Sequence, residues 1–106
     1  MPQQVILIKE ASQGTKLDIA KHLASCGCRV FVTHSKGIDP TELKKAAEEF
    51  MDYLTILPLA IESETSMQIA LELIANILRE QSSTQEVYLS ILEPVRTYRI
   101  THEAPV

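Results

Sequence analysis

Four short apolar runs, separated by segments with helical periodicity, constrain the fold of this chain more than any other feature of its sequence. The runs occupy residues 4–8, 30–33, 54–57 and 87–92, and apart from Gln4 the first run is apolar at every position. Consecutive apolar residues are typical of a strand that is buried on both faces, as in the middle of a parallel sheet. The sequence therefore predicts four strands, the first of them central.

Between these runs, apolar residues recur at intervals of three and four, which predicts helices. We expect helices over residues 16–25, from Asp39 to about 51, and over 65–80. Asp39 is suited to the N-cap of the second helix and Pro40 to its first position. Gly27 suits the left-handed residue that follows the first helix. The buried stripe of the second helix is expected to comprise Leu43, Ala46, Ala47, Phe50 and Met51.

Alternating strands and helices of these lengths predict βαβ units and a parallel sheet. We expect a single Rossmann-like α/β half domain over residues 1–106, with helices on both faces of a four-stranded parallel sheet in the order 3-2-1-4. Residues 94–106 are expected to form a tail or to add an edge strand around 97–100.

Composition excludes several classes of function. The formal net charge of −4 over 106 residues disfavours nucleic acid and anionic membranes as partners. No apolar run reaches the ~18 residues of a membrane span, and the N-terminus does not resemble a signal peptide, so we expect a cytoplasmic protein. Cys26 and Cys28 could hold a soft metal with His22 and His34, but the favoured interpretation is two small apolar side chains and no metal site.

The first strand and the turn after it carry a resemblance to a known family. Residues 9–16 read Lys-Glu-Ala-Ser-Gln-Gly-Thr-Lys. This segment resembles the Thr-Gly-Ala-Ser-x-Gly-Ile-Gly turn of the short-chain dehydrogenase/reductase family, and the likeness extends over about the first 92 residues. The resemblance implies that Ser12, Gln13, Gly14, Thr15, Lys16 and His34 would contact a dinucleotide, if any ligand binds.

Departures from the family pattern argue against that cofactor. Glu10 and Lys16 replace two of the three turn glycines, which the family needs so that the backbone can approach the pyrophosphate. Ala60 stands where the family has an aspartate that meets adenine. The family's Asn-Asn-Ala-Gly motif is replaced by Ser-Ile-Leu-Glu at 90–93, and none of the three tyrosines has a lysine four residues on. NAD(P) binding is therefore disfavoured, no cofactor is expected, and no proton donor for hydride transfer is identified.

Three hypotheses follow for the function. The leading one is a non-catalytic domain that acts through protein contacts, as a homo-oligomer or with another protein. Its predicted interface is Ile69, Leu73 and Ile77, which widen the apolar stripe of the third helix. The second is a small nucleotide- or phosphate-binding domain, or a related enzyme, that uses residues 10–16 and the helix N-terminus after Gly14. In that loop, Ser12 is expected to cap the helix. The third is a remnant without present activity.

Overall fold

The computed structural model describes residues 5–34, 37–81, 86–92 and 95–101 of the chain. In chain order the elements are β1 (Val5–Ile8), α1 (Gly14–Ser25), β2 (Arg29–Thr33), α2 (Thr41–Glu49), β3 (Leu54–Leu57), α3 (Glu64–Gln81), β4 (Glu86–Leu92) and β5 (Val95–Thr101). Predictions on Gln4, Glu93, Pro94 and residues 102–106 lie outside the described residues.

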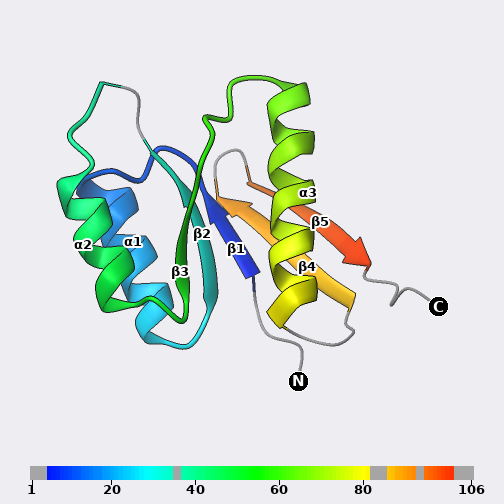
Figure 1. Cartoon of the computed structure of the whole chain (residues 1–106), viewed down its shortest axis with the longest axis horizontal. Coiled ribbons are helices and arrows are strands. Elements are labelled where there is room, and N and C mark those ends of the chain that lie inside the picture. Colours follow the sequence, from blue (N-terminus) through cyan, green and yellow to red (C-terminus); the bar gives the residue numbers. More distant parts are fainter. Residues whose placement is uncertain (1–4, 35–36, 82–85, 93–94, 102–106) are drawn as a thin grey trace.

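The strands form one sheet in the order β3-β2-β1-β4-β5 (Figure 1). The pairs β1–β2, β2–β3 and β1–β4 are parallel, with Ile6 opposite both Val30 and Ser90. The last pair, β4–β5, is antiparallel, with Leu92 opposite Val95. Only two residues separate β4 from β5, and a connection that short joins antiparallel strands only. The predicted α/β class, with parallel strands that alternate with helices, is confirmed.

Two apolar cores lie on opposite faces of this sheet, because side chains alternate between the faces along each strand. One core joins strand residues to α3, which lies alone on its face in Figure 1; its fully buried members include Leu7, Phe31 and Ile74. The other joins Ile6, Ile8, Val30 and Val32 to α1 and α2. Every residue of β1 and β2 is buried, as predicted for their apolar residues, and burial extends to Arg29 and Thr33 at the ends of β2.

The predicted stripe of α2 is wrong at its end. The helix ends at Glu49, and Met51 is 74% exposed. The backbone N–H groups of Tyr53 and Leu54 both donate to the carbonyl of Phe50, at 2.8 and 2.7 Å. This turn directs the chain into β3, so Met51 leaves the helix at the position where periodicity alone would have buried it.

The start of α2 also differs from the prediction by one position. Pro40 is the N-cap and Thr41 the first helical residue. Asp39 nevertheless caps the helix with its side chain, because its Oδ1 accepts a hydrogen bond from the Thr41 N–H at 2.9 Å and another from the Thr41 hydroxyl. These bonds from Thr41, together with the nearby charge of Lys44, lower the pKa of the Asp39 carboxyl below its ordinary value.

A charged residue begins β2, one position before the predicted start of the strand. Arg29 is only 3% exposed, and its guanidinium lies 4.5 Å from the centre of the Phe31 ring. Its Nη1 donates to the carbonyl of Tyr53 at 2.9 Å, and burial lowers the pKa of the guanidinium. Arg29 thus ties the start of β2 to the turn before β3.

Ile74→Ala should destabilise the protein by about 2–5 kcal/mol, because Ile74 is fully buried between α3 and the sheet and its truncation leaves a cavity. Ile19→Ala is the matched control on α1, where the side chain is 37% exposed. It should cost less than about 1 kcal/mol. Urea unfolding followed by circular dichroism measures both. Equal losses would contradict the placement of α3.

Asp39→Ala should destabilise the protein in a pH-dependent way. The folded pKa of Asp39 is lowered, so its stabilising effect is complete above the unfolded pKa of about 3.8 and is lost as the pH falls through the folded value. The difference in unfolding midpoint between wild type and variant should therefore be constant near neutral pH and shrink below about pH 4. A difference that grows on acidification would show that the Asp39–Thr41 bonds do not form.

Candidate functional site

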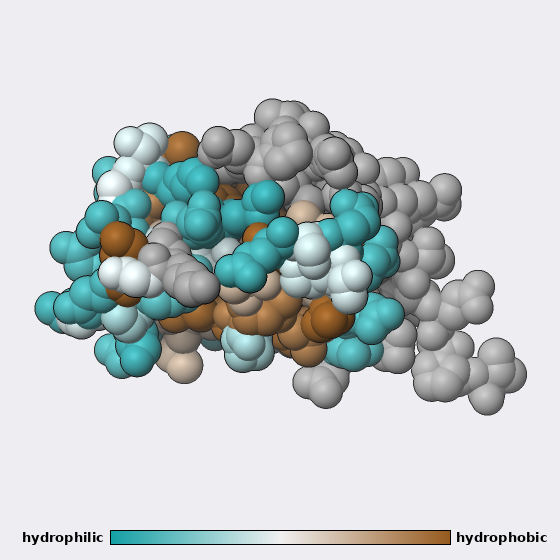
Figure 2. All heavy atoms as spheres, turned by 90° about the horizontal axis from the view of Figure 1, so that it is seen from above, coloured by the Kyte–Doolittle hydropathy of each residue, from teal (hydrophilic) through white to brown (hydrophobic). Residues whose placement is uncertain are grey.

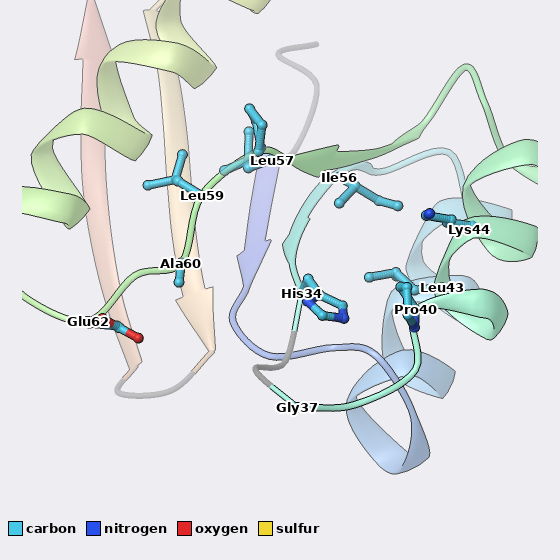
Figure 3. A pocket seen from close by; sticks show the side chains of 11 residues that line it. His34, Gly37, Pro40, Leu43, Lys44, Ile56, Leu57, Leu59, Ala60 and Glu62 are labelled. Atoms are coloured by element: carbon cyan, nitrogen blue, oxygen red, sulfur yellow. The ribbon is translucent and has the colours of Figure 1, made fainter.

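A cavity of about 600 Å³ opens where β2 and β3 end. Its walls come from α2 on one side and from the segment after β3 on the other (Figure 3). The carboxyl ends of parallel strands are the usual place for ligands in open α/β sheets. A cavity of this volume lies within the range of small-molecule sites.

Most of the cavity lining is apolar. The apolar side chains come from both sides of the strand end: Pro40, Leu43, Ile56, Leu57, Pro58, Leu59 and Ala60. Ile56 and Leu57 are consecutive, so they belong to opposite faces of β3: Leu57 is part of the core on the α3 face, and Ile56 packs against the core on the other face. The cavity therefore continues around the end of the edge strand from one face of the sheet to the other.

Three polar side chains complete the lining. His34 follows β2, Lys44 belongs to α2, and Glu62 lies just before α3. In Figure 3 the ammonium of Lys44 and the carboxylate of Glu62 lie at opposite sides of the cavity, with apolar side chains between them. Seen from above, hydrophobic side chains reach the surface in a band along one border of the molecule, whereas the other described surface in that view is mainly hydrophilic (Figure 2).

Local hydrogen bonds hold both walls in place. The Nε2 of His34 lies 2.7 Å from the carbonyl of Ile38; because a carbonyl only accepts, this nitrogen carries the proton. On the opposite wall, the hydroxyl of Ser66 accepts hydrogen bonds from the N–H groups of Glu62 and Ser63, both at 2.8 Å. The Ser66 N–H in turn donates to the Ser63 hydroxyl at 3.2 Å, which caps α3.

The turn after β1 lies apart from this cavity lining. The N–H of Glu10 donates to the hydroxyl of Thr33, and the N–H of Ala11 to the Thr33 carbonyl, both at 3.0 Å. Two backbone donors of the turn are thus used by the end of β2. Glu10 has a φ of 54°, and it is the only non-glycine residue with positive φ in the described part of the chain. This conformation is one that glycine adopts at lower cost.

The predicted ligand residues are only partly brought together. His34 lines the cavity, whereas Ser12, Gln13, Gly14, Thr15 and Lys16 do not. Ser12 is fully buried and is not the helix cap, because α1 begins earlier than predicted, at Gly14, with Gln13 as its N-cap. Gln13 makes no side-chain capping bond, and the first turn of α1 holds no acidic residue. The sequence did not point to Leu43, Lys44 and Ile56 as cavity residues, because their pattern resembles that of an ordinary amphipathic helix and a buried strand.

The cysteines and histidines form no metal site within the described residues, where no three His, Cys, Asp or Glu side chains are grouped to hold an ion. Cys26 is exposed at the end of α1, with its Sγ 3.8 Å from the Nε2 of His22. Cys28 is half-buried and packs against the core beside α1. Gly27 between them has a φ of 89°, as its predicted place after the helix requires.

The predicted interface residues of α3 differ in exposure. Ile69 is 47% exposed, Leu73 is half-buried, and Ile77 packs against the core on the α3 face. They are spaced four apart, so they form one stripe along the helix. Of the helices in the described part of the chain, none is long and apolar enough to span a membrane.

Comparison with known proteins identifies no relative from which a function of these residues could be inferred. No family model, no curated protein and no solved structure matches the chain.

Proposed function

We propose that this chain is a non-catalytic binding domain that acts through protein contacts, with a second copy of itself or with another protein. The observation that carries the proposal is the apolar stripe of Ile69, Leu73 and Ile77 on α3. A residue whose role is only to fill the core is buried there, whereas Ile69 is 47% exposed to solvent. Removal of such a side chain from water on association is favourable.

The position of α3 strengthens this proposal. α3 covers one face of a five-stranded sheet, whereas α1 and α2 pack together on the other face (Figure 1). A helix is about 10 Å wide, and five strands at about 4.8 Å extend over more than 20 Å. A partner that packs beside α3 would contact Ile69 and Leu73 and extend the layer that α3 begins.

We further propose that the domain is a Rossmann-like half of the short-chain dehydrogenase type whose cofactor turn has been modified. The sheet order around β1 and the left-handed backbone at Glu10, where the family has glycine, support this relationship. The bonds from Glu10 and Ala11 to Thr33 argue against a dinucleotide, because they occupy N–H groups that could otherwise face a pyrophosphate. We therefore propose that the domain uses no NAD(P) cofactor.

Ile69→Glu combined with Leu73→Glu should dissociate the assembly, because two buried carboxylates without partners are strongly unfavourable at an interface. Light scattering of the wild type should give the mass of a dimer or larger oligomer, and the double variant that of a monomer. Gln68→Glu combined with Asn76→Glu is the matched control, since both residues are exposed on α3 beside the stripe. A double variant that keeps the wild-type mass, or a monomeric wild type, would rule out self-association through this stripe.

A phosphate-bearing ligand at the N-terminus of α1 is the second candidate function. The first turn of α1 holds no acidic residue, Gln13 gives no side-chain cap, and Lys16 lies in that turn. The N–H groups and the dipole of a helix N-terminus favour an anion. Glu10 is exposed and lies four residues before the start of α1, and its negative charge opposes the binding of an anion there.

Lys16→Ala should weaken any binding of NADH, NADPH or inorganic phosphate by about tenfold, the equivalent of one charge-assisted hydrogen bond. Isothermal titration measures the affinity. Lys21→Ala on the same helix is the control, because it removes an equal charge about one and a half turns away. Equal affinities of wild type and Lys16→Ala, or equal losses in both variants, would exclude a local phosphate site.

A further inference from the structure

We infer that the cavity at the end of β3 binds a small amphipathic molecule with an apolar body and an anionic head. The head would lie beside Lys44 and the body between Ile56 and Leu59. This site is separate from the α3 stripe and from the N-terminus of α1, so it is tested independently of both proposals above.

The path of the chain explains why the cavity is open. β3 is an edge strand, so no further strand covers its outer side in the described sheet. At Pro58 the chain leaves the sheet and passes to α3, which packs on the face opposite to α2. The space between α2 and residues 58–62 is therefore bridged by no element in the described part of the chain. Apolar surface in such a space remains in contact with water unless a ligand covers it.

The lining selects an apolar body. Leu43 is fully buried and Ile56 and Leu59 are half-buried, so the walls are continuous with the cores and are held by packing. Such walls give binding energy through the area that they remove from water. They offer few hydrogen-bond partners, which disfavours a polar base or sugar: the protonated nitrogen of His34 is already used by the Ile38 carbonyl. The side chain of Ala60 also has no group that could hydrogen-bond to a base.

The charges at the rim set the orientation of the ligand. Lys44 on α2 gives the cavity one cationic border, and Glu62 gives it one anionic border. The carboxylate of Asp39 stays ionised and offsets part of the Lys44 charge, but its two bonds to Thr41 hold it at the start of α2. Because Lys44 is the cationic side chain of the lining and Glu62 the anionic one, an anionic head is favoured at the α2 side and opposed at the Glu62 side. A ligand with a cationic head would have to bind in the reverse direction, with its head next to Glu62.

Octanoate, octylammonium and adenosine are the probes that test this inference. Nuclear magnetic resonance titration of the ¹⁵N-labelled full chain should show octanoate shifting the amide signals of Lys44, Ile56 and Leu59, with weaker binding of octylammonium. Lys44→Gln should lower the affinity for octanoate by about threefold and leave that for octylammonium unchanged or higher. Glu62→Gln, the matched variant at the opposite border, should leave octanoate binding unchanged or stronger.

A second variant tests the cavity without changing its charge. Ala60→Trp places a large side chain in the opening and should weaken octanoate binding by about tenfold or more, whereas Asn76→Trp on the exposed side of α3 should not. Circular dichroism confirms that both variants are folded. Tighter binding of octylammonium than octanoate, shifts at these residues with adenosine alone, or octanoate shifts unaffected by Ala60→Trp would each overturn the inference.

Discussion

Burial of β1 and β2 on both faces is the constraint on which the rest of this structure depends. All nine residues of the two strands are buried, and their side chains alternate between two cores. A strand with two apolar faces requires a layer on each side, because exposed apolar surface is unfavourable in water. The crossovers after β1 and β2 supply α1 and α2 for one face, and the crossover after β3 supplies α3 for the other. The face that each helix covers follows from the strand order, because parallel crossovers are right-handed and the chain reverses its direction along the sheet after β3.

The change of face after β3 produces the feature with the clearest potential for binding. Because α2 and α3 lie on opposite sides of the sheet, residues 58–62 cross the end of an edge strand, and an apolar cavity is left beside them. Its two walls are held by short-range bonds, Asp39 to Thr41 on one side and Ser63 to Ser66 on the other. By contrast, the turn after β1 directs two of its N–H groups to Thr33, which leaves that turn less suited to a pyrophosphate.

The elements were largely predictable from local pattern. Both bounds of β3 are those that its apolar run predicts, and every other predicted end either coincides with the observed one or differs from it by one or two residues. The errors have physical causes. The apolar run begins at Val30, but β2 begins at Arg29, which is buried against the Phe31 ring and bonded to the Tyr53 carbonyl. Met51 continues the helical period of α2, but the turn at Phe50 ends the helix before it.

The sequence by itself determined the α/β class, the alternation of strands and helices and the burial of β1 and β2, because each depends on the periodicity of a few adjacent residues. Only the tertiary structure decided the candidate site. His34, Lys44 and Glu62 are far apart in sequence, and none is unusual in its own segment. They line one cavity because the strand order makes β3 an edge and because α2 and α3 cover opposite faces of the sheet. The position of this cavity depends on how helices pack on both faces of the sheet, and the periodicity of a single segment does not specify that packing.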